Sequence, residues 1–388
     1  MPSIFLPSLL FEIFSNLSQV QLHNVDFWRY PELEPKGIAR LKAWGKDQCL
    51  AIANQLLLSH MAQFPAGHAT TTLLDILNRL PDYERTYDLF DTDYSRCVMI
   101  KVLAFRVLSN RYMKLPQNQP EFWKLRHSLE AGEFQDRSVV PSQVGGFALP
   151  MYDLHPLGYD IRLRAHAMNI LSTFMLKQYD SRVQNDSVHV LPGDIVIDGG
   201  ACWGDTSLYF AFLCGNAGKV FAFEILPENL AIMEQNINDN PGLAGRIECV
   251  RRALWNQSGE TLGYTSRASG TSLLVGSKDD GSVESISIDE WVEQRSLPRV
   301  NFIKLDVEGA ELSTLRGAEN TIRTFKPRLA ISVYHREDDL ISIPEFLCSL
   351  NCGYRLLLDH FTIHNEETIL FADPQATIAT SKIPEHRQ

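Results

Sequence analysis

The sequence predicts an α/β protein: the second half builds a seven-stranded, mostly parallel sheet, and a mainly helical first half precedes it. Three observations support this fold class. The chain has 388 residues, which is longer than one hydrophobic core usually reaches, so we expect two domains or one domain with a large appendage. Apolar residues recur at mostly helical spacing from about residue 36 to 180. After Pro192-Gly193, short apolar runs alternate with helical segments, as in parallel sheets.

The composition is that of a folded, enzyme-sized protein. Hydrophobic residues make up 45% and charged residues 21% of the chain, which excludes a collagenous or wholly disordered protein. Thirty-six Lys and Arg against 47 Asp and Glu give a net charge of −11. Nucleic acid and anionic membrane surfaces are therefore not expected as partners. The seven cysteines are scattered without paired spacing, as expected for reduced thiols, so we expect a cytoplasmic protein.

The first half carries helical signals and one irregular stretch. The apolar opening, residues 3–18, has no basic residue ahead of it; it predicts a helix or strand docked on the body, with a partner or membrane contact as the alternative, and not a secretory signal. Pro and Gly cluster between residues 115 and 160, which indicates irregular connection with a short strand near 146–151. Two stripes at helical spacing predict a buried helical core: Val98, Val102 and Phe105 behind the capping segment 91–93, and Met168, Leu171 and Met175.

The second half is expected to supply all strands of the main sheet. The last two runs have only a brief connection between them, as an antiparallel pair requires. The expected strands lie within residues 194–200, 219–224, 246–254, 300–307, 328–335, 354–361 and 367–372. We therefore predict a mainly helical domain over 1–150, a connecting segment over 151–189, a sheet domain over 190–375 and a tail over 376–388.

The first predicted strand ends in a loop suited to a nucleotide. Asp198 is followed by Gly199, Gly200, Ala201 and, further on, Gly204, before a helical segment begins. Glycine is needed where the backbone approaches a ligand or takes positive φ, and a strand-to-helix turn offers free N–H groups. The second strand ends in Glu224, whose carboxylate is placed to accept hydrogen bonds from ribose hydroxyls. Together these features predict an adenosine-containing ligand.

Charge decides between the adenosine ligands. A dinucleotide loop requires glycine where this chain has Ala201, and carboxylates at Asp198 and Asp205 would face a pyrophosphate. S-adenosylmethionine instead carries a positive sulfur and an ammonium group. The acidic strand end therefore favours this methyl donor over a nicotinamide or flavin dinucleotide.

Several segments resemble the successive motifs of the FkbM-type S-adenosylmethionine-dependent methyltransferases. They are IDGGACWGDTS, FAFEILPENL, SISIDEW and, above all, NFIKLDVEGAELSTLRGAENTI, within residues 190–372. The resemblance implies a class I Rossmann-like methyltransferase fold and methyl transfer to a hydroxyl of a small metabolite such as a sugar or polyketide, as in natural product biosynthesis. It implies that Asp198, Gly200, Gly204 and Glu224 hold the cofactor, with Asn229 fixing the turn after Glu224. Cys202 stands where many members have Asn.

Candidate catalytic residues follow the fourth and fifth strands. Residues 301–307 read as a strand that places Lys304 and Asp306 on one face, with Asp306 at the carboxyl end and Glu308 just after it. Ligands bind at that edge of doubly wound sheets. The alternative is structural: a salt bridge of Lys304 with Asp306 or Glu308, and carboxylates favoured at a helix start. Glu311 is expected to stabilise that helix start.

Two histidines end later strands. His335 and His360 are candidate bases at the same sheet edge, because imidazole titrates near neutrality; a hydrogen-bonded structural His is the alternative for each. A divalent ion held by Asp306, Glu308, His335 and His360 stays open, but we assign no metal.

The mechanism we expect is an in-line displacement in which a hydroxyl oxygen attacks the methyl group on sulfur and Asp306 or His335 takes the proton. The alternatives are an NAD-type oxidoreductase and a noncatalytic S-adenosylmethionine-binding module. The helical half is expected either to cover the acceptor site or to build a dimer interface, which leaves a homo-oligomer open.

Overall fold

The computed structural model describes residues 3–17, 66–110, 112–144, 146–183, 188–265, 272–274 and 281–374. The part of the expected helical stretch before residue 66 and the expected tail, residues 376–388, lie outside these ranges. The helices are α1 (Phe5–Asn16), α4 (Ala66–Asn78), α5 (Leu80–Leu89), α6 (Asp93–Leu108), α7 (Pro120–Glu130), α8 (Ala167–Asn169), the π-helix η3 (Ile170–Met175), α9 (Asp205–Cys214), α10 (Pro227–Asn238), α11 (Pro241–Ala244), α12 (Ile288–Gln294), α13 (Glu311–Arg316), α14 (Glu319–Phe325) and α15 (Asp339–Ser349).

A seven-stranded sheet forms the centre of the molecule, and its strand order is β14-β15-β13-β12-β5-β6-β7. Its strands are β5 (Ile195–Gly199), β6 (Lys219–Phe223), β7 (Ile247–Val250), β12 (Phe302–Leu305), β13 (Arg328–Ser332), β14 (Tyr354–His360) and β15 (Thr368–Pro374). Only β15 runs antiparallel to its neighbours, between β13 and β14. This is the order of the class I Rossmann-like methyltransferase fold, so the predicted fold class is confirmed.

Alternating side chains bury both faces of this sheet. On β5, Ile197 packs with the helices α12 to α15, whereas Val196 packs with α8 to α11 on the other face. Because successive side chains of a strand point to opposite faces, a strand covered on both sides must be apolar throughout. The continuous apolar runs of the sequence are the consequence.

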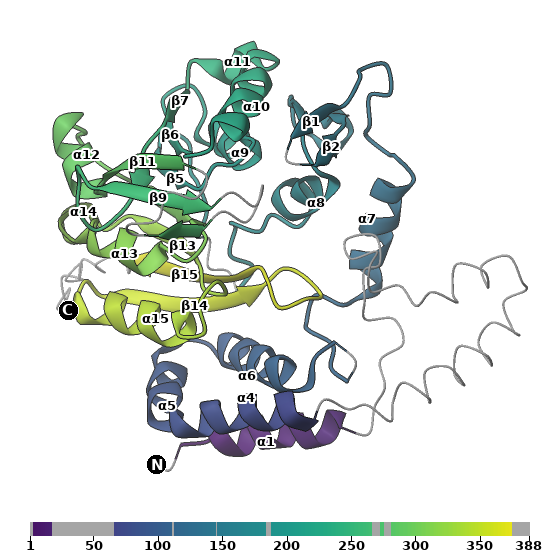
Figure 1. Ribbon diagram of the computed structural model, residues 1–388, viewed down its shortest axis with the longest axis vertical. Coiled ribbons are helices and arrows are strands. Elements are labelled where there is room, and N and C mark those ends of the chain that lie inside the picture. The colour runs from purple at the N-terminus through teal and green to yellow at the C-terminus, as the bar shows by residue number, and fades with distance from the viewer. Residues whose placement is uncertain are drawn as a thin grey trace, which may run out of the picture.

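The N-terminal helices pack at the β14 end of the sheet. In Figure 1, α1, α4, α5 and α6 gather beneath β14 and α15. Thr92 caps α6 as its Oγ1 accepts from the Ser95 N–H at 3.1 Å. The Asp91 N–H donates to the Leu356 carbonyl of β14 at 3.0 Å. The first expected helical stripe is buried on α6, and the second is buried on α8 and η3, with Met175 half-buried. The helices α1, α4, α5 and α6 share one apolar core with a face of the sheet. The domain boundaries stay a prediction.

The smaller strands were only partly predicted. The expected strand near residue 146–151 is present as β2 (Phe147–Leu149), which pairs with β1 (Ser142–Val144), and as the start of β3 (Met151–Asp153), which pairs with β4 (Arg162–Arg164). The third strand of the main sheet, expected within 246–254, is present as β7. The residues that follow it form β8 (Ala253–Leu254), which belongs to a separate four-stranded sheet with β9 (Thr261–Thr265), β10 (Ser272–Leu274) and β11 (Gly281–Ile286). This second sheet was not predicted.

The apolar opening forms α1, which buries Phe5, Leu9 and Ile13 against the body, as the sequence predicts. Among the helices the structure describes, none combines the length and the apolar character that crossing a membrane requires.

Candidate functional site

The loop after β5 is held so tightly that it requires glycine. Gly200 has φ +77°, and a Cβ there would stand 1.8 Å from the carbonyl oxygen of Asp306. Gly204 has φ +83°, and its Cβ would stand 2.7 Å from Met233 Cγ. Gly199 is the last residue of β5, and Ala201 is wholly buried. The predicted loop is thus present, and it touches the backbone that follows β12.

Lys304 and Asp198 form a buried pair beneath this loop. They are register partners on β12 and β5, and Lys304 Nζ lies 3.2 Å from Asp198 Oδ1. The same ammonium donates to the carbonyls of Gly199 at 3.0 Å and Gly200 at 2.7 Å. Asp198 Oδ2 accepts from the hydroxyls of Thr206 and Ser207 at 2.7 and 2.6 Å. These contacts with Asp198 and the loop backbone favour a positioning role for Lys304 over the predicted catalytic one.

Glu224 is fixed at the end of β6 by backbone amides. Its Oε1 accepts from the N–H groups of Ile225 and Leu226 at 2.7 and 2.8 Å, and its Oε2 accepts from the Cys202 N–H at 2.9 Å. Burial raises the pKa of Glu224, while these amides and Asn229 oppose that rise. Asn229 also accepts from Trp203 Nε1 at 2.9 Å. Glu224 therefore links the glycine loop to β6, and Asn229 supports it from behind.

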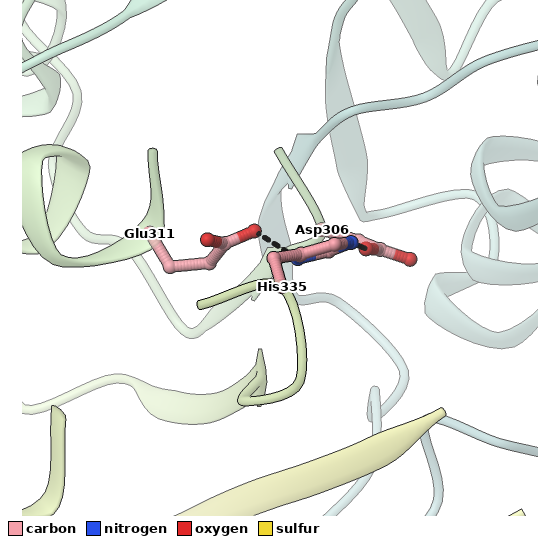
Figure 2. A group of neighbouring side chains, drawn as sticks. All are labelled: Asp306, Glu311 and His335. Carbon is pink, nitrogen blue, oxygen red and sulfur yellow. Dashed lines mark ion pairs between the residues drawn. The ribbon is translucent and has the colours of Figure 1, made fainter. Parts of the chain in front are cut away.

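At the carboxyl ends of β12 and β13, one imidazole lies among carboxylates. Figure 2 shows His335 between Glu311 and Asp306. Its Nδ1 lies 2.9 Å from Glu311 Oε1, and its Nε2 lies 3.4 Å from both Asp306 Oδ1 and Glu308 Oε2. Ligand atoms of Asp306, Glu311 and His335 all lie within 4.8 Å of one another, which is compact enough for a metal ion. The described part of the chain thus brings three of the predicted catalytic residues together and adds Glu311.

Two tyrosines complete the polar surroundings of Asp306. The Tyr179 hydroxyl donates to Asp306 Oδ2 at 2.9 Å, and the Tyr334 hydroxyl donates to Oδ1 at 3.2 Å.

The backbone of Glu308 adopts positive φ, +54°. This conformation costs energy for a residue with a side chain and is found at functional sites more than elsewhere.

Electrostatics assigns a protonation state to each group. Burial alone would lower the pKa of His335, but Glu311, Asp306 and Glu308 raise it to about 10. Burial raises the pKa of Asp306, but the charges of His335 and Lys304 outweigh this and lower it below its ordinary value. Burial raises the pKa of Glu308 to about 8. At neutral pH, His335 is therefore an imidazolium and Asp306 a carboxylate.

His360 does not join this group through any contact in the described residues. It is fully buried, its Nδ1 lies 2.9 Å from Thr368 Oγ1, and its Nε2 lies 3.5 Å from Thr362 Oγ1. Burial lowers the pKa of His360 to about 4. Because both ring nitrogens face threonines, the structural alternative describes His360 better than the predicted catalytic role.

A cavity of about 510 Å³ opens beside the group of Figure 2. Tyr334, His335 and Arg336 line it from the sheet side. From the helical side it is lined by residues of α4, α5 and α6, Arg106 among them, and by Arg79 between α4 and α5. Its volume falls in the range of roughly 300–1,000 Å³ that is usual for small-molecule sites. The helical half therefore covers the sheet edge at which ligands are expected.

Residues 192–356 match the family model of the methyltransferase FkbM domain. Over these residues the chain is similar to the FkbM methyltransferases. The resemblance of the sequence motifs is thereby confirmed, and the FkbM domain contains every predicted site residue except His360.

A curated relative is the hexuronic acid methyltransferase AglP of Haloferax volcanii, which is 33% identical over 116 residues. These residues are 29% of this chain and 47% of the relative, so the match spans about half of the relative's length.

Two solved structures show lower similarity. The methyltransferase FkbM of Methylobacillus flagellatus has a TM-score of 0.49 at 19% identity, covering 77% of this chain and 60% of that chain. Fibrillarin of Aeropyrum pernix, solved with S-adenosyl-L-methionine, has a TM-score of 0.35 at 12% identity, covering 59% and 90%. Our fold assignment rests on the strand order of the sheet itself.

Sequence reasoning missed four residues of the site. Tyr179 and Arg106 precede the FkbM domain, and no local motif marks them. Tyr334 directly precedes the candidate His335, and this position next to a predicted site residue could have marked it. Glu311 was expected to stabilise a helix start; it does accept from the Val307 N–H at 2.8 Å, but it also faces His335.

Proposed function

We propose that the protein is an S-adenosylmethionine-dependent O-methyltransferase that acts on a hydroxyl of a small metabolite. One observation carries this proposal beyond the family match: three features of the FkbM domain adjoin one another. The glycine loop touches the Asp306 backbone, Asp306 lies 3.4 Å from His335, and His335 lines the cavity. A cofactor on the loop and an acceptor in the cavity would meet at Asp306.

The chemistry of the loop fits the proposed cofactor. When bound, S-adenosylmethionine supplies an electrophilic methyl group on a positively charged sulfur. Three backbone amides and the Asn229 side chain hold the Glu224 carboxylate in place. Its orientation at the end of β6 is thus fixed before a ribose hydroxyl binds. Asp198, Asp205 and Glu224 surround the loop with carboxyl groups, which suits a cationic ligand better than a pyrophosphate.

Asp306 is the group we assign to the proton of the acceptor hydroxyl. His335 already carries a proton at neutral pH, so it is not free to take another. The imidazolium keeps Asp306 ionised, and the Tyr179 and Tyr334 hydroxyls fix the orientation of the carboxylate. A carboxylate of low pKa is a weak base, so proton transfer accompanies attack and does not precede it. His335 is thus a positioning residue for Asp306.

The cavity suits a compact, polar acceptor such as a sugar. Its wall includes Thr72, Asp75 and Asn365 beside the charged groups, and such groups bind hydroxyls by hydrogen bonding. The name of the relative from Haloferax volcanii, a hexuronic acid methyltransferase, supports a sugar-type acceptor over a polyketide. The unpaired spacing of the cysteines supports a cytoplasmic site of action.

Calorimetry with S-adenosylhomocysteine, the demethylated product, tests the proposal. We expect the wild-type protein and Asp306→Asn to bind it with similar affinity, because Asp306 touches the loop only through its backbone. We expect Asp306→Asn to lose methyl transfer to a panel of monosaccharides by about 10²-fold or more. Full activity of Asp306→Asn would remove Asp306 from the mechanism.

The same experiment separates the two alternatives. A tenfold preference for a nicotinamide dinucleotide over S-adenosylhomocysteine would identify an oxidoreductase. Cofactor binding without transfer to any hydroxylated acceptor would identify a binding module. Either result contradicts the proposed function.

A further inference from the structure

Two guanidinium groups that line the cavity beside His335, those of Arg106 and Arg336, have no carboxylate in contact among the described residues. Within the described ranges, neither Arg106 nor Arg336 has a carboxylate oxygen within 4.0 Å. Arg106 reaches only the Glu337 carbonyl, at 3.5 Å, and its buried Nε has no hydrogen-bond partner there. Arg79, on the same wall, lies 3.8 Å from Asp82. A buried guanidinium nitrogen such as Arg106 Nε is costly unless something pairs with it.

Arg106 is aimed at this space by the fold. It lies in the last turn of α6, and its neighbours on the helix, Phe105 and Val107, are buried. Burial lowers the pKa of Arg106 below its ordinary value, but a guanidinium stays protonated in proteins. The charge therefore persists in the cavity at neutral pH.

The cavity wall carries an excess of positive charge. The arginines on it are Arg79, Arg106 and Arg336, and the acidic groups on it are Asp75 and Glu337. The charge of His335 is not counted, because the carboxylates of Glu311, Asp306 and Glu308 face its ring. The whole chain has a net charge of −11, so this excess runs against the balance of the protein. A guanidinium binds the two oxygens of a carboxylate or of a phosphate side by side.

We infer that the acceptor is anionic and that Arg106, with Arg336 beside it, binds its carboxylate or phosphate group in this cavity. This inference rests on the proposed function for the identity of the site and names the class of its substrate: an acidic sugar with a free hydroxyl. Arg106 holds the anionic group, and the hydroxyl to be methylated lies toward His335 and Asp306.

The test measures binding, so it does not depend on turnover. Calorimetry is run on the full chain saturated with S-adenosylhomocysteine, with methyl glucuronide, glucose 6-phosphate and methyl glucoside as probes. Three variants accompany the wild type: Arg106→Gln, Arg106→Lys and the control Arg96→Gln. Arg96 is on the same helix but pairs with Asp93 at 2.8 Å on the surface, outside the cavity.

We expect the wild type to bind at least one of the two acidic sugars at least tenfold more tightly than the neutral glucoside, and the preferred acid identifies the anionic group. Arg106→Gln should lose that preference by about tenfold or more, because hydrogen bonds to a charged partner are among the strong ones. Arg106→Lys should restore part of it, and Arg96→Gln should keep all of it.

Equal affinity for acidic and neutral sugars, heat from none of the three, or an unchanged preference in Arg106→Gln would overturn the inference. If circular dichroism shows that Arg106→Gln is unfolded, Arg336→Gln replaces it, because Arg336 is exposed and its substitution should leave the fold intact. The preference of Arg336→Gln for the acidic sugar over the neutral glucoside must then be at least threefold lower than that of the wild type. If the protein gives no heat with S-adenosylhomocysteine, the proposed function fails, and the sugar series run without it still decides on the cavity.

Discussion

Lys304 offers the sharpest test of how the glycine loop is held. The substitution Lys304→Met keeps much of the side-chain volume but removes the charge that faces Asp198 at 3.2 Å and the donors to Gly199 and Gly200. Both partners are at most 1% exposed. Removing one member of a buried ion pair costs about 3–5 kcal/mol, because the other charge stays buried without compensation.

The expected loss lies near the lower limit of that range, about 3 kcal/mol, because Asp198 keeps its hydrogen bonds from Thr206 and Ser207. Adding Asp198→Asn to Lys304→Met removes the unpaired charge, so the double variant should regain about 2 kcal/mol relative to additivity. The matched control is Lys101→Met. Lys101 pairs with Glu12 at 2.8 Å but is 29% exposed, so its loss should cost less than about 1 kcal/mol.

Guanidinium chloride unfolding, followed by tryptophan fluorescence, measures five proteins at neutral pH: the wild type, Lys304→Met, Asp198→Asn, the double variant and Lys101→Met. Trp203 lies in the loop and is 1% exposed, so its emission reports on the region of interest. We also expect Lys304→Met to bind S-adenosylhomocysteine more weakly. A free energy of unfolding within 1 kcal/mol of wild type for Lys304→Met, or additivity within about 0.5 kcal/mol in the double variant, would refute the reasoning.

Three further predictions concern the loop, His360 and the group of Figure 2. Gly200→Ala and Gly193→Ala both place a side chain at positive φ, which costs about 1–2 kcal/mol. Only the new Cβ at residue 200 would meet a backbone oxygen, at 1.8 Å, whereas Gly193 faces open space. Thermal unfolding should therefore show the larger loss of stability for Gly200→Ala, and equal losses would contradict the geometry. The pKa of His360 is lowered from 6.5 to about 4, so as the pH falls the unfolded chain binds this proton before the folded chain does, and stability should fall by about 3 kcal/mol between these pH values. In denaturant unfolding, the stability of His360→Gln should depend less steeply on acid pH than that of the wild type. The same pH dependence in both proteins would argue against a neutral buried imidazole. Dialysis against EDTA should leave methyl transfer unchanged, since the imidazolium of His335 already supplies a positive charge among the carboxylates; a loss restored by Mg²⁺ or Mn²⁺ would instead assign the three residues to a metal ion.

The fold could be predicted from the sequence because its signals are local. The apolar run of β5 and the glycines after it are adjacent in the chain, and their meaning does not depend on distant residues. The second sheet was missed because β8 has only Ala253 and Leu254, too few residues for a visible pattern, and its partner Ile286 lies far along the chain.

The site could be predicted only where a strand end marked it. Asp306, Glu308 and His335 end or follow strands, so topology alone brings them to one edge. His360 also ends a strand, but two threonines face its ring, and the sequence does not show which strand-end histidine meets carboxylates. Arg106 lies within a helix whose other residues read as core, so nothing local distinguishes it.

The join between Phe90 and Leu356 has a consequence for how the protein is made. These residues form a bridge between the segment before α6 and the strand β14, and the Ser95 hydroxyl accepts from the Leu358 N–H at 2.9 Å. During synthesis, α6 leaves the ribosome more than two hundred residues before its partner strand β14 does. Until then the part of α6 that packs on β14 has no native cover, so the nascent chain should depend on chaperones, and truncation before β14 should yield aggregated material.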